Sequence, residues 1–396
     1  MQFLDDKSKA ENATTSTSYT THPLVLICLR KIDSNRAFTI ELHSTEPAFI
    51  VEETLLVWAL TALPAVFTKA EAEAVWSREE RAAEIIDEIW DYVTGEGLVL
   101  PVNEAQEINK RCALWNQIGG SNAGIYHEAT RDYPFVDMSR KDAFLADNAR
   151  MKNYEEGGTA PSVYQSFNAI QSVPLQKVTA DFASYIEGDA RDKIKDLSLI
   201  FDFCFGERIK LEHAFDEQEF LQLESLRKAI PSGGGRHPTE VFIAVFDQNQ
   251  MGLHPGLYHY NVQGNKLDLL RSGELYDELH VVLGSTDQLD ANGTGRPGAL
   301  MFFTSLCERA MWRYRDPRSW RAYLIDIGHV EFMCSQVCAS LGYSLKFCHG
   351  QNSPEAARFL AIDPFTQPVM ALSTLSTQSH SNHPSTQSLS LDQSTN

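Results

Sequence analysis

A glycine-rich loop that runs directly into an apolar segment constrains this chain most. Residues 231–238 read Pro-Ser-Gly-Gly-Gly-Arg-His-Pro, and residues 239–246 read Thr-Glu-Val-Phe-Ile-Ala-Val-Phe. Three consecutive glycines permit backbone dihedrals that other residues avoid, and they let N–H groups approach a ligand closely. The apolar run is short and rich in β-branched and aromatic residues, which predicts a buried strand. The loop alone is equally consistent with a surface turn, because it matches neither a P-loop nor a dinucleotide-binding fingerprint.

Two further motifs follow the loop in order. The first is Gly-Leu-His-Pro-Gly-Leu-Tyr-His-Tyr at 252–260; the second is Arg313-Tyr314, followed by Trp-Arg-Ala-Tyr-Leu-Ile-Asp-Ile-Gly-His at 320–329. Together with the loop, these motifs resemble the SagB-type dehydrogenases, a branch of the FMN-dependent nitroreductase superfamily, over roughly residues 190–372. The resemblance implies an α+β fold with a mixed sheet flanked by helices. It also implies FMN at a dimer interface and oxidation of a ring, such as an azoline, during peptide or natural-product maturation.

The patterns divide the chain into five segments. The two ends of the chain are polar and rich in Ser and Thr, which predicts disorder there. The expected strands and helices do not alternate strictly, which predicts an α+β class rather than a Rossmann fold. The expected segments are a disordered leader at 1–20, a winged-helix-like peptide-recognition module at 21–102, a connecting segment at 103–175, a nitroreductase-like FMN domain at 176–372 and a disordered tail at 373–396.

The first module combines strands and helices. The expected elements are strands at 23–29, 37–42 and 98–100 and helices at 53–63, from 68 onward and at 81–93. Thr68-Lys-Ala-Glu71 matches a capping box, which opens a helix. The last helix carries the acidic residues Glu84, Asp87, Glu88 and Asp91. Their charges would repel phosphate, which disfavours DNA binding. Peptide binding and a purely packing role both remain open for this module.

In the second half, the periodicity predicts helices at 197–206, 216–228 and 323–341 and strands at 299–304 and 368–372. The apolar face of 323–341, together with the family's interface flavin site, favours a homodimer or a heterodimer with a related chain. Cys334 and Cys338 lie one helical turn apart without further ligands at zinc spacing. They are therefore expected to be buried thiols, and no metal site is expected.

The net charge of the chain limits the classes of partner that it is expected to bind. The formal net charge is −19, from 53 acidic and 34 basic residues. This balance disfavours nucleic acid and anionic membranes as partners and tolerates a neutral or basic peptide or a small molecule. The sequence has no apolar run of membrane-spanning length and no secretory signal pattern, and its seven cysteines have no framework spacing. These features predict a cytoplasmic protein.

The resemblance places the cofactor site on the glycine loop. It implies that Ser232, Gly233, Gly234 and Arg236 contact the flavin, with His237 as a weaker candidate. The loop's backbone N–H groups would then face the carbonyl oxygens of the ring and tune its electron affinity.

The phosphate site departs from the family's pattern. The family's Arg-Arg-Ser-x-Arg segment is replaced by Asp-Ala-Arg-Asp-Lys at 189–193, where Arg191 and Lys193 are the basic residues. The Gly-rich run expected after residue 342 is replaced by bulkier residues that include Lys346 and His349. Arg191 and Lys346 are therefore the candidate phosphate contacts.

The family's catalytic Lys-Tyr pair is Arg313-Tyr314 here. Arginine stays protonated in proteins, so Arg313 cannot take a proton, although its charge favours the phenolate of Tyr314 or could hold a substrate carbonyl. Tyr314 is then the candidate base. The alternative that both residues simply lie on a surface helix, without a catalytic role, remains open. The two competing functions are an FMN-dependent oxidoreductase and a catalytically silent partner that binds peptide without flavin turnover.

Overall fold

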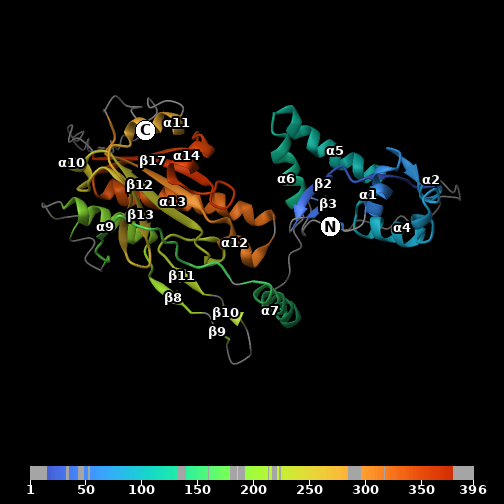
Figure 1. The fold of residues 1–396 in the computed structure, drawn as a ribbon, viewed down its shortest axis with the longest axis horizontal. Coiled ribbons are helices and arrows are strands. Elements are labelled where there is room, and N and C mark those ends of the chain that lie inside the picture. Colours follow the sequence, from blue (N-terminus) through green and yellow to red (C-terminus); the bar gives the residue numbers. More distant parts are fainter. Residues whose placement is uncertain are drawn as a thin grey trace, which may run out of the picture. The chain divides into compact units, whose positions relative to one another are not determined.

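The computed structural model describes residues 16–32, 35–42, 49–51, 54–131, 140–158, 160–178, 185, 192–212, 214–215, 221–222, 224–283, 296–315 and 317–377. The chain forms two compact units. One comprises Met1–Val136 with Arg315–Arg318, and the other comprises Asp137–Tyr314 with Ser319–Asn396. Figure 1 shows the helices and strands of both units, coloured along the sequence.

The first unit contains two small antiparallel sheets. In one, β1 (Ser18–Thr21) lies between β5 (Phe67–Thr68) and β6 (Val99–Pro101). In the other, β3 (Asn35–Leu42) lies between β2 (Val25–Ile32) and β4 (Phe49–Val51). The helices are α1 (Thr54–Thr61), α2 (Lys69–Trp76), α3 (Glu80–Ala83), α4 (Ile86–Gly95), α5 (Val102–Gln117) and α6 (Ser121–Arg131). The predicted strands and helices are present, whereas the winged-helix assignment stays a prediction.

The capping box predicted at the start of α2 is confirmed. The Thr68 hydroxyl accepts from the backbone N–H of Glu71, and the Glu71 carboxylate accepts from the backbone N–H of Thr68 at 2.7 Å. The helix predicted at 81–93 is divided into α3 and α4. Ile85, with φ −134° and ψ 32°, leaves the helical region and separates them. Periodicity cannot detect this break, because the apolar residues keep their spacing across it.

The predicted connecting segment at 103–175 is largely helical. Helices α5 and α6 belong to the first unit, and α7 (Lys141–Glu156) belongs to the second. Within this segment, Gly124 serves packing, because a Cβ atom at this position would collide with the Trp115 ring. The two compact units divide after residue 136, within the segment predicted as connecting.

The second unit is built on a seven-stranded sheet in the order β16-β17-β15-β12-β13-β14-β7. The strands are β7 (Gln171–Pro174), β12 (Thr239–Val245), β13 (Gly256–Asn261), β14 (Lys266–Ser272), β15 (Ala299–Ser305), β16 (Tyr343–Cys348) and β17 (Val369–Thr377). Each neighbouring pair is antiparallel, so the sheet is not the mixed type that was expected. The predicted α+β class, a sheet flanked by helices, is confirmed.

Alternation along β12 explains why helices cover both faces of this sheet. Val241 and Ile243 pack into a core with α9 (Lys193–Phe205) and α13 (Trp320–Ser340). Phe242 and Ala244 pack into a second core with α11 (Leu279–Leu283) and α14 (Ser353–Leu360). Successive side chains of a strand point to opposite faces, so a strand covered on both sides reads as a continuous apolar run. This is the pattern that predicted a buried strand after the loop.

The helix predicted at 216–228 is wrong where the structure describes it. The segment instead contributes to two antiparallel hairpins, β8 (Ile209–Leu211) with β11 (Ser225–Arg227) and β9 (Ala214–Phe215) with β10 (Leu221–Gln222). Residues 216–220 lie outside the described residues. The helix-forming residues of this stretch are overridden because pairing with the preceding strands satisfies their backbone groups. Strand β11 leads directly into the glycine loop.

The predicted ends of the folded region shift by a few residues. Strand β1 begins at Ser18, within the predicted leader, because it pairs with β5 and β6. Strand β17 continues to Thr377, within the predicted tail, because it pairs with β15 and β16. The remainder of both predictions lies outside the described residues. None of the helices in the described ranges is long and apolar enough to cross a membrane.

The predicted thiol pair Cys334 and Cys338 is confirmed as buried. Both lie in the core between α9 and α13, together with Cys204. Burial raises the pKa of Cys338 and of Cys334, which keeps these thiols protonated.

Candidate functional site

The glycine loop is a tight turn that satisfies much of its own backbone. Gly235 N–H donates to the Ser232 carbonyl at 2.9 Å, and Arg236 N–H donates to the Gly233 carbonyl at 3.3 Å. His237 N–H donates to the Ser232 hydroxyl oxygen at 2.9 Å. These donors are therefore not directed outward, in contrast to the expectation that the loop's N–H groups face a ligand.

Asp326 on α13 anchors the start of the loop. Its carboxylate accepts from the Ser232 hydroxyl at 2.7 Å and from the Gly233 N–H at 3.0 Å. Burial raises the pKa of Asp326, although these two hydrogen bonds act in the opposite direction. Sequence reasoning missed this residue, even though it lies within the motif at 320–329. The available signal was an acidic residue on an otherwise apolar helix face.

Two glycines of the loop are required by both conformation and space. Gly234 and Gly235 have φ values of 62° and 64°, which disfavour a side chain. A Cβ atom at Gly234 would collide with Tyr314 Oη, and one at Gly235 would collide with the Arg227 guanidinium. The structure therefore brings together Gly234 and Tyr314, two residues that the resemblance assigned to the site through separate motifs.

Tyr314 and Arg313 end helix α12 (Cys307–Tyr314) but have different surroundings. Tyr314 is 42% exposed. Arg313 donates from Nη2 to Asp147 of α7 at 2.7 Å, and its guanidinium carbon lies 5.5 Å from the centre of the Tyr314 ring. The ion pair between Arg313 and Asp147 therefore links α12 to α7.

Arg236 and His237 are both buried at the end of the loop. Burial lowers the pKa of His237 to about 3, and the charges of Lys228, Arg227, Arg309 and Arg236 act in the same direction. His237 is therefore neutral at physiological pH. Its backbone has φ 47°, a value uncommon for a residue with a side chain. The site around the loop carries positive charge in a chain whose net charge is −19.

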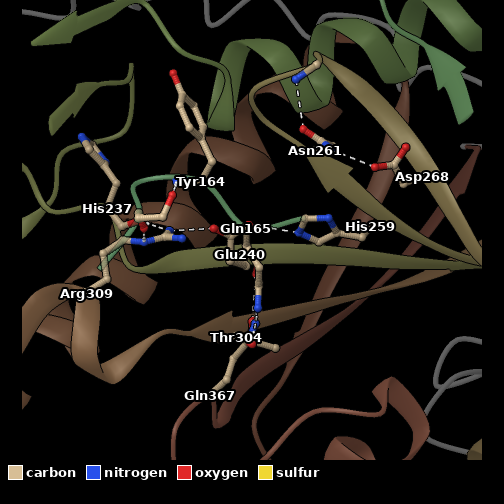
Figure 2. Close-up of polar contacts among 12 residues, drawn as sticks. Tyr164, Gln165, His237, Glu240, His259, Asn261, Asp268, Thr304, Arg309 and Gln367 are labelled. Carbon is tan, nitrogen blue, oxygen red and sulfur yellow. Dashed lines mark hydrogen bonds and ion pairs between the residues drawn. The ribbon is translucent and has the colours of Figure 1, made fainter. Parts of the chain in front are cut away.

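A buried ion pair supports the loop from the sheet side (Figure 2). Glu240 of β12 accepts from Arg309 Nη1 of α12 at 2.6 Å, and its other oxygen lies 3.0 Å from His259 Nε2 of β13. Arg309 also donates to the backbone carbonyls of His237 and Ser162. Burial favours a higher pKa for Glu240, but Arg309 and His259 outweigh it and lower the pKa to about 2.

This network connects the loop to the helix that carries Tyr314. Arg309 and Tyr314 lie on the same short helix, and the Arg309 guanidinium contacts the carbonyl of His237 at the end of the loop. Sequence reasoning did not single out Glu240, His259 or Arg309, although the first two lie within the quoted motifs. A polar residue inside each of two apolar strands was the available signal, because buried polar groups are normally hydrogen-bonded.

A cavity of about 20 Å³ lies beside the loop, lined in part by Lys228, Ser232, His237 and Asp326. This volume suits a single water molecule and not a cofactor. Burial lowers the pKa of Lys228 to about 8. Burial thus disfavours the charge of Lys228, but with a pKa of about 8 the amine is still mostly protonated at neutral pH.

The structure describes one of the two predicted phosphate contacts. Arg191 lies outside the described residues, and Lys346 is an exposed residue of β16, the strand at one edge of the sheet. Within the described ranges, no group of three or more His, Cys, Asp and Glu side chains is arranged to hold a metal ion.

No family model matches the chain. Two curated proteins are similar to it in sequence. The trifolitoxin-processing protein TfxB of Rhizobium leguminosarum bv. trifolii is 35% identical over 162 residues, which are 40% of this chain and 42% of the relative. The microcin B17-processing protein McbC of Escherichia coli is 24% identical over 144 residues, which are 36% of this chain and 51% of the relative. The chain thus spans about half the length, or less, of these relatives.

Solved structures of nitroreductase type are also similar. One is a nitroreductase-type protein from Anabaena variabilis, with 18% identity and a TM-score of 0.44, covering 57% of this chain and 45% of that one. Another is the Escherichia coli microcin synthetase McbBCD complex with truncated pro-MccB17 bound, with 16% identity and a TM-score of 0.37, covering 63% of this chain and 86% of that one. The two curated relatives, TfxB and McbC, confirm the predicted resemblance to SagB-type, nitroreductase-like dehydrogenases.

Proposed function

We propose that the chain is an FMN-dependent dehydrogenase that oxidises a ring, such as an azoline, in a peptide undergoing maturation. The observation that carries the proposal is the contact between Tyr314 and Gly234 of the loop. It unites the candidate base with the segment that the resemblance assigns to the cofactor. The sequence similarity to processing proteins of trifolitoxin and microcin B17 supports the peptide substrate class.

The positive charges around the loop suit an anionic cofactor. Arg227 lies against Gly235, Arg236 is buried within the loop, and Lys228 lines the cavity beside it. In this proposal Gly234, Arg236 and the neutral His237 contact the cofactor, while Asp326 holds Ser232 and Gly233 in place. Arg191 and Lys346 remain proposed phosphate contacts. FMN, when bound, supplies the acceptor for a hydride.

Oxidation of an azoline removes a proton and a hydride from adjacent ring atoms. Tyr314 receives the proton at Oη, because it is exposed and lies at the loop, whereas Arg313 is tied to Asp147 and cannot accept a proton. Arg313 therefore acts by holding the end of α12, and hence Tyr314, in position.

Cofactor content tests this proposal directly. The chain would be purified, its visible spectrum recorded, and FMN titrated into any colourless fraction. We expect flavin absorbance, or saturable FMN binding, and bleaching of the flavin when a peptide substrate is added without oxygen. Protein that takes up no FMN would rule the proposal out.

A catalytically silent partner is the second candidate function. It is favoured by Asp326, which occupies the Ser232 and Gly233 donors, and by the aspartates that flank Arg191 in the sequence. In that case the chain folds without flavin, binds peptide and completes a heteromer with a related chain. Turnover of a peptide by the isolated chain with added FMN would exclude this alternative.

The proposed assembly is a homodimer in the cytoplasm. Helix α13 carries exposed apolar side chains, Leu324, Ile325 and Phe332, on a helix that otherwise packs into the core. Exposed apolar residues grouped on one element favour a protein partner. A second copy of the chain would cover them, consistent with an interfacial cofactor site.

A further inference from the structure

The side chain of Arg236 is buried and makes few polar contacts with the described residues. It is 6% exposed, and its hydrogen bond within the described residues is a long one, 3.4 Å from Nε to the Arg309 carbonyl. It has no carboxylate partner in the part of the chain that the structure describes. Burying a charge is costly unless the charge is paired, so Arg236 differs from an ordinary structural arginine.

The neighbouring arginines make the contrast clear. Arg309 is paired with Glu240 at 2.6 Å, and Arg313 is paired with Asp147 at 2.7 Å. Each of these guanidiniums therefore has a structural function. Burial lowers the pKa of Arg236; Tyr314 opposes this effect, whereas the charges of Arg313 and Arg309 add to it. Within the described residues, Arg236 therefore has like charges nearby and no carboxylate counterion.

The position of Arg236 indicates where that anion would lie. Arg236 ends the glycine turn whose Gly234 lies against Tyr314, and its Nε lies 3.4 Å from the carbonyl of Arg309 on α12, the helix that ends in Tyr314, so its guanidinium lies beside that helix. The planar fork of an arginine matches the two oxygens of a carboxylate or phosphate. A flavin ring alone offers single carbonyl oxygens, which do not require a fork.

We propose that Arg236 is the anchor of an oxyanion site at the glycine loop, which binds a phosphate or carboxylate group in bidentate fashion. The source of this group rests on the proposed function: it is the phosphate of the cofactor or a carboxylate of the peptide substrate. In either case Arg236 is an anion contact in addition to the proposed Arg191 and Lys346.

The test uses the full chain and small anions as probes. Binding of inorganic phosphate and of acetate would be measured by calorimetry at low ionic strength for the wild type, Arg236→Met, Arg236→Lys and Arg140→Met. Arg140 is an exposed arginine paired with Asp142 and serves as the matched control. We expect Arg236→Met to weaken binding about tenfold or more, because a charge-assisted hydrogen bond is lost. Arg140→Met should bind as the wild type does.

Arg236→Lys keeps the test decisive if the methionine variant does not fold. It retains the charge but loses the fork, so it should weaken phosphate binding by a smaller factor. Wild-type affinity in both Arg236 variants, or no binding of either anion to the wild type at millimolar concentration, would overturn the proposal.

Titrations with FMN and riboflavin, which lacks the phosphate, identify the source. Selective loss of FMN affinity in Arg236→Met identifies the cofactor phosphate. Loss of acetate binding with unchanged affinity for both flavins identifies a substrate carboxylate. A wild type that binds acetate or phosphate through Arg236 but binds no flavin would refute the proposed function while leaving the oxyanion site standing.

Discussion

The hydroxyl of Tyr314 lies against Gly234, and the residue is 42% exposed, so a substrate held at the loop can reach it. If Tyr314 takes the proton, Tyr314→Phe should lower the rate of flavin reduction by about 10²–10⁴, the usual contribution of a positioned general base. Flavin content should not change, because the phenyl ring keeps its packing. Single-turnover flavin reduction by substrate, followed in a stopped-flow instrument, measures this rate.

Arg313→Lys is the control for that measurement at the residue scale. A lysine keeps a positive charge opposite Asp147 and therefore retains much of the link between α12 and α7. We expect a rate near that of the wild type, in contrast to Tyr314→Phe. If Tyr314→Phe reduced flavin as fast as the wild type, Tyr314 would have no part in the mechanism and the silent-partner function would gain support.

At the scale of elements, the Glu240–Arg309 pair joins β12 to α12, with His259 of β13 on its other side. Glu240→Gln leaves the Arg309 guanidinium buried without its counterion, which typically costs about 3–5 kcal/mol. The pKa of Glu240 is lowered from 4.5 to about 2 in the folded state. The contribution of the carboxylate is therefore complete above pH 4.5 and is lost as the pH falls towards 2.

Urea unfolding at several pH values checks both parts of this prediction. The difference in unfolding free energy between wild type and Glu240→Gln should be largest near neutral pH and shrink with acidification. Glu355→Gln, which removes a surface partner of Arg358, should change the stability by about 1 kcal/mol or less. A neutral-pH cost for Glu240→Gln as small as this control would mean that the buried pair does not stabilise the unit.

Local sequence patterns correctly predicted the elements that are determined by residues close together in the sequence. Strand β12, helix α13 and the capping box at Thr68 each carry their signal within a few residues. Residues 225–227 could not be predicted as a strand, because their pairing partner lies in 209–211. The same limit applies to the site: Gly234 and Tyr314 were identified separately, but Asp326 and Arg309 act through contacts that only the tertiary structure creates.

At the scale of the whole molecule, α13 favours a dimer. Ile325 and Phe332 lie seven residues apart, on one face of the helix, and are 59% and 66% exposed. A Cβ atom at Gly328 between them would meet nothing within 4 Å, so this face is open to the close approach of a second element. An obligate interface is usually large and apolar, which makes its centre sensitive to charge.

The double variant Ile325→Glu/Phe332→Glu should therefore convert a dimeric wild type into a monomer, because pairing two copies would bury unpaired carboxylates. Sedimentation velocity at micromolar concentration distinguishes the two states. Phe365→Glu is the matched control: Phe365 is 90% exposed but lies outside α13, and its replacement should leave the dimer intact. If the wild type with bound flavin sediments as a monomer, the α13 face does not join two copies, and the cofactor site must be complete within one chain.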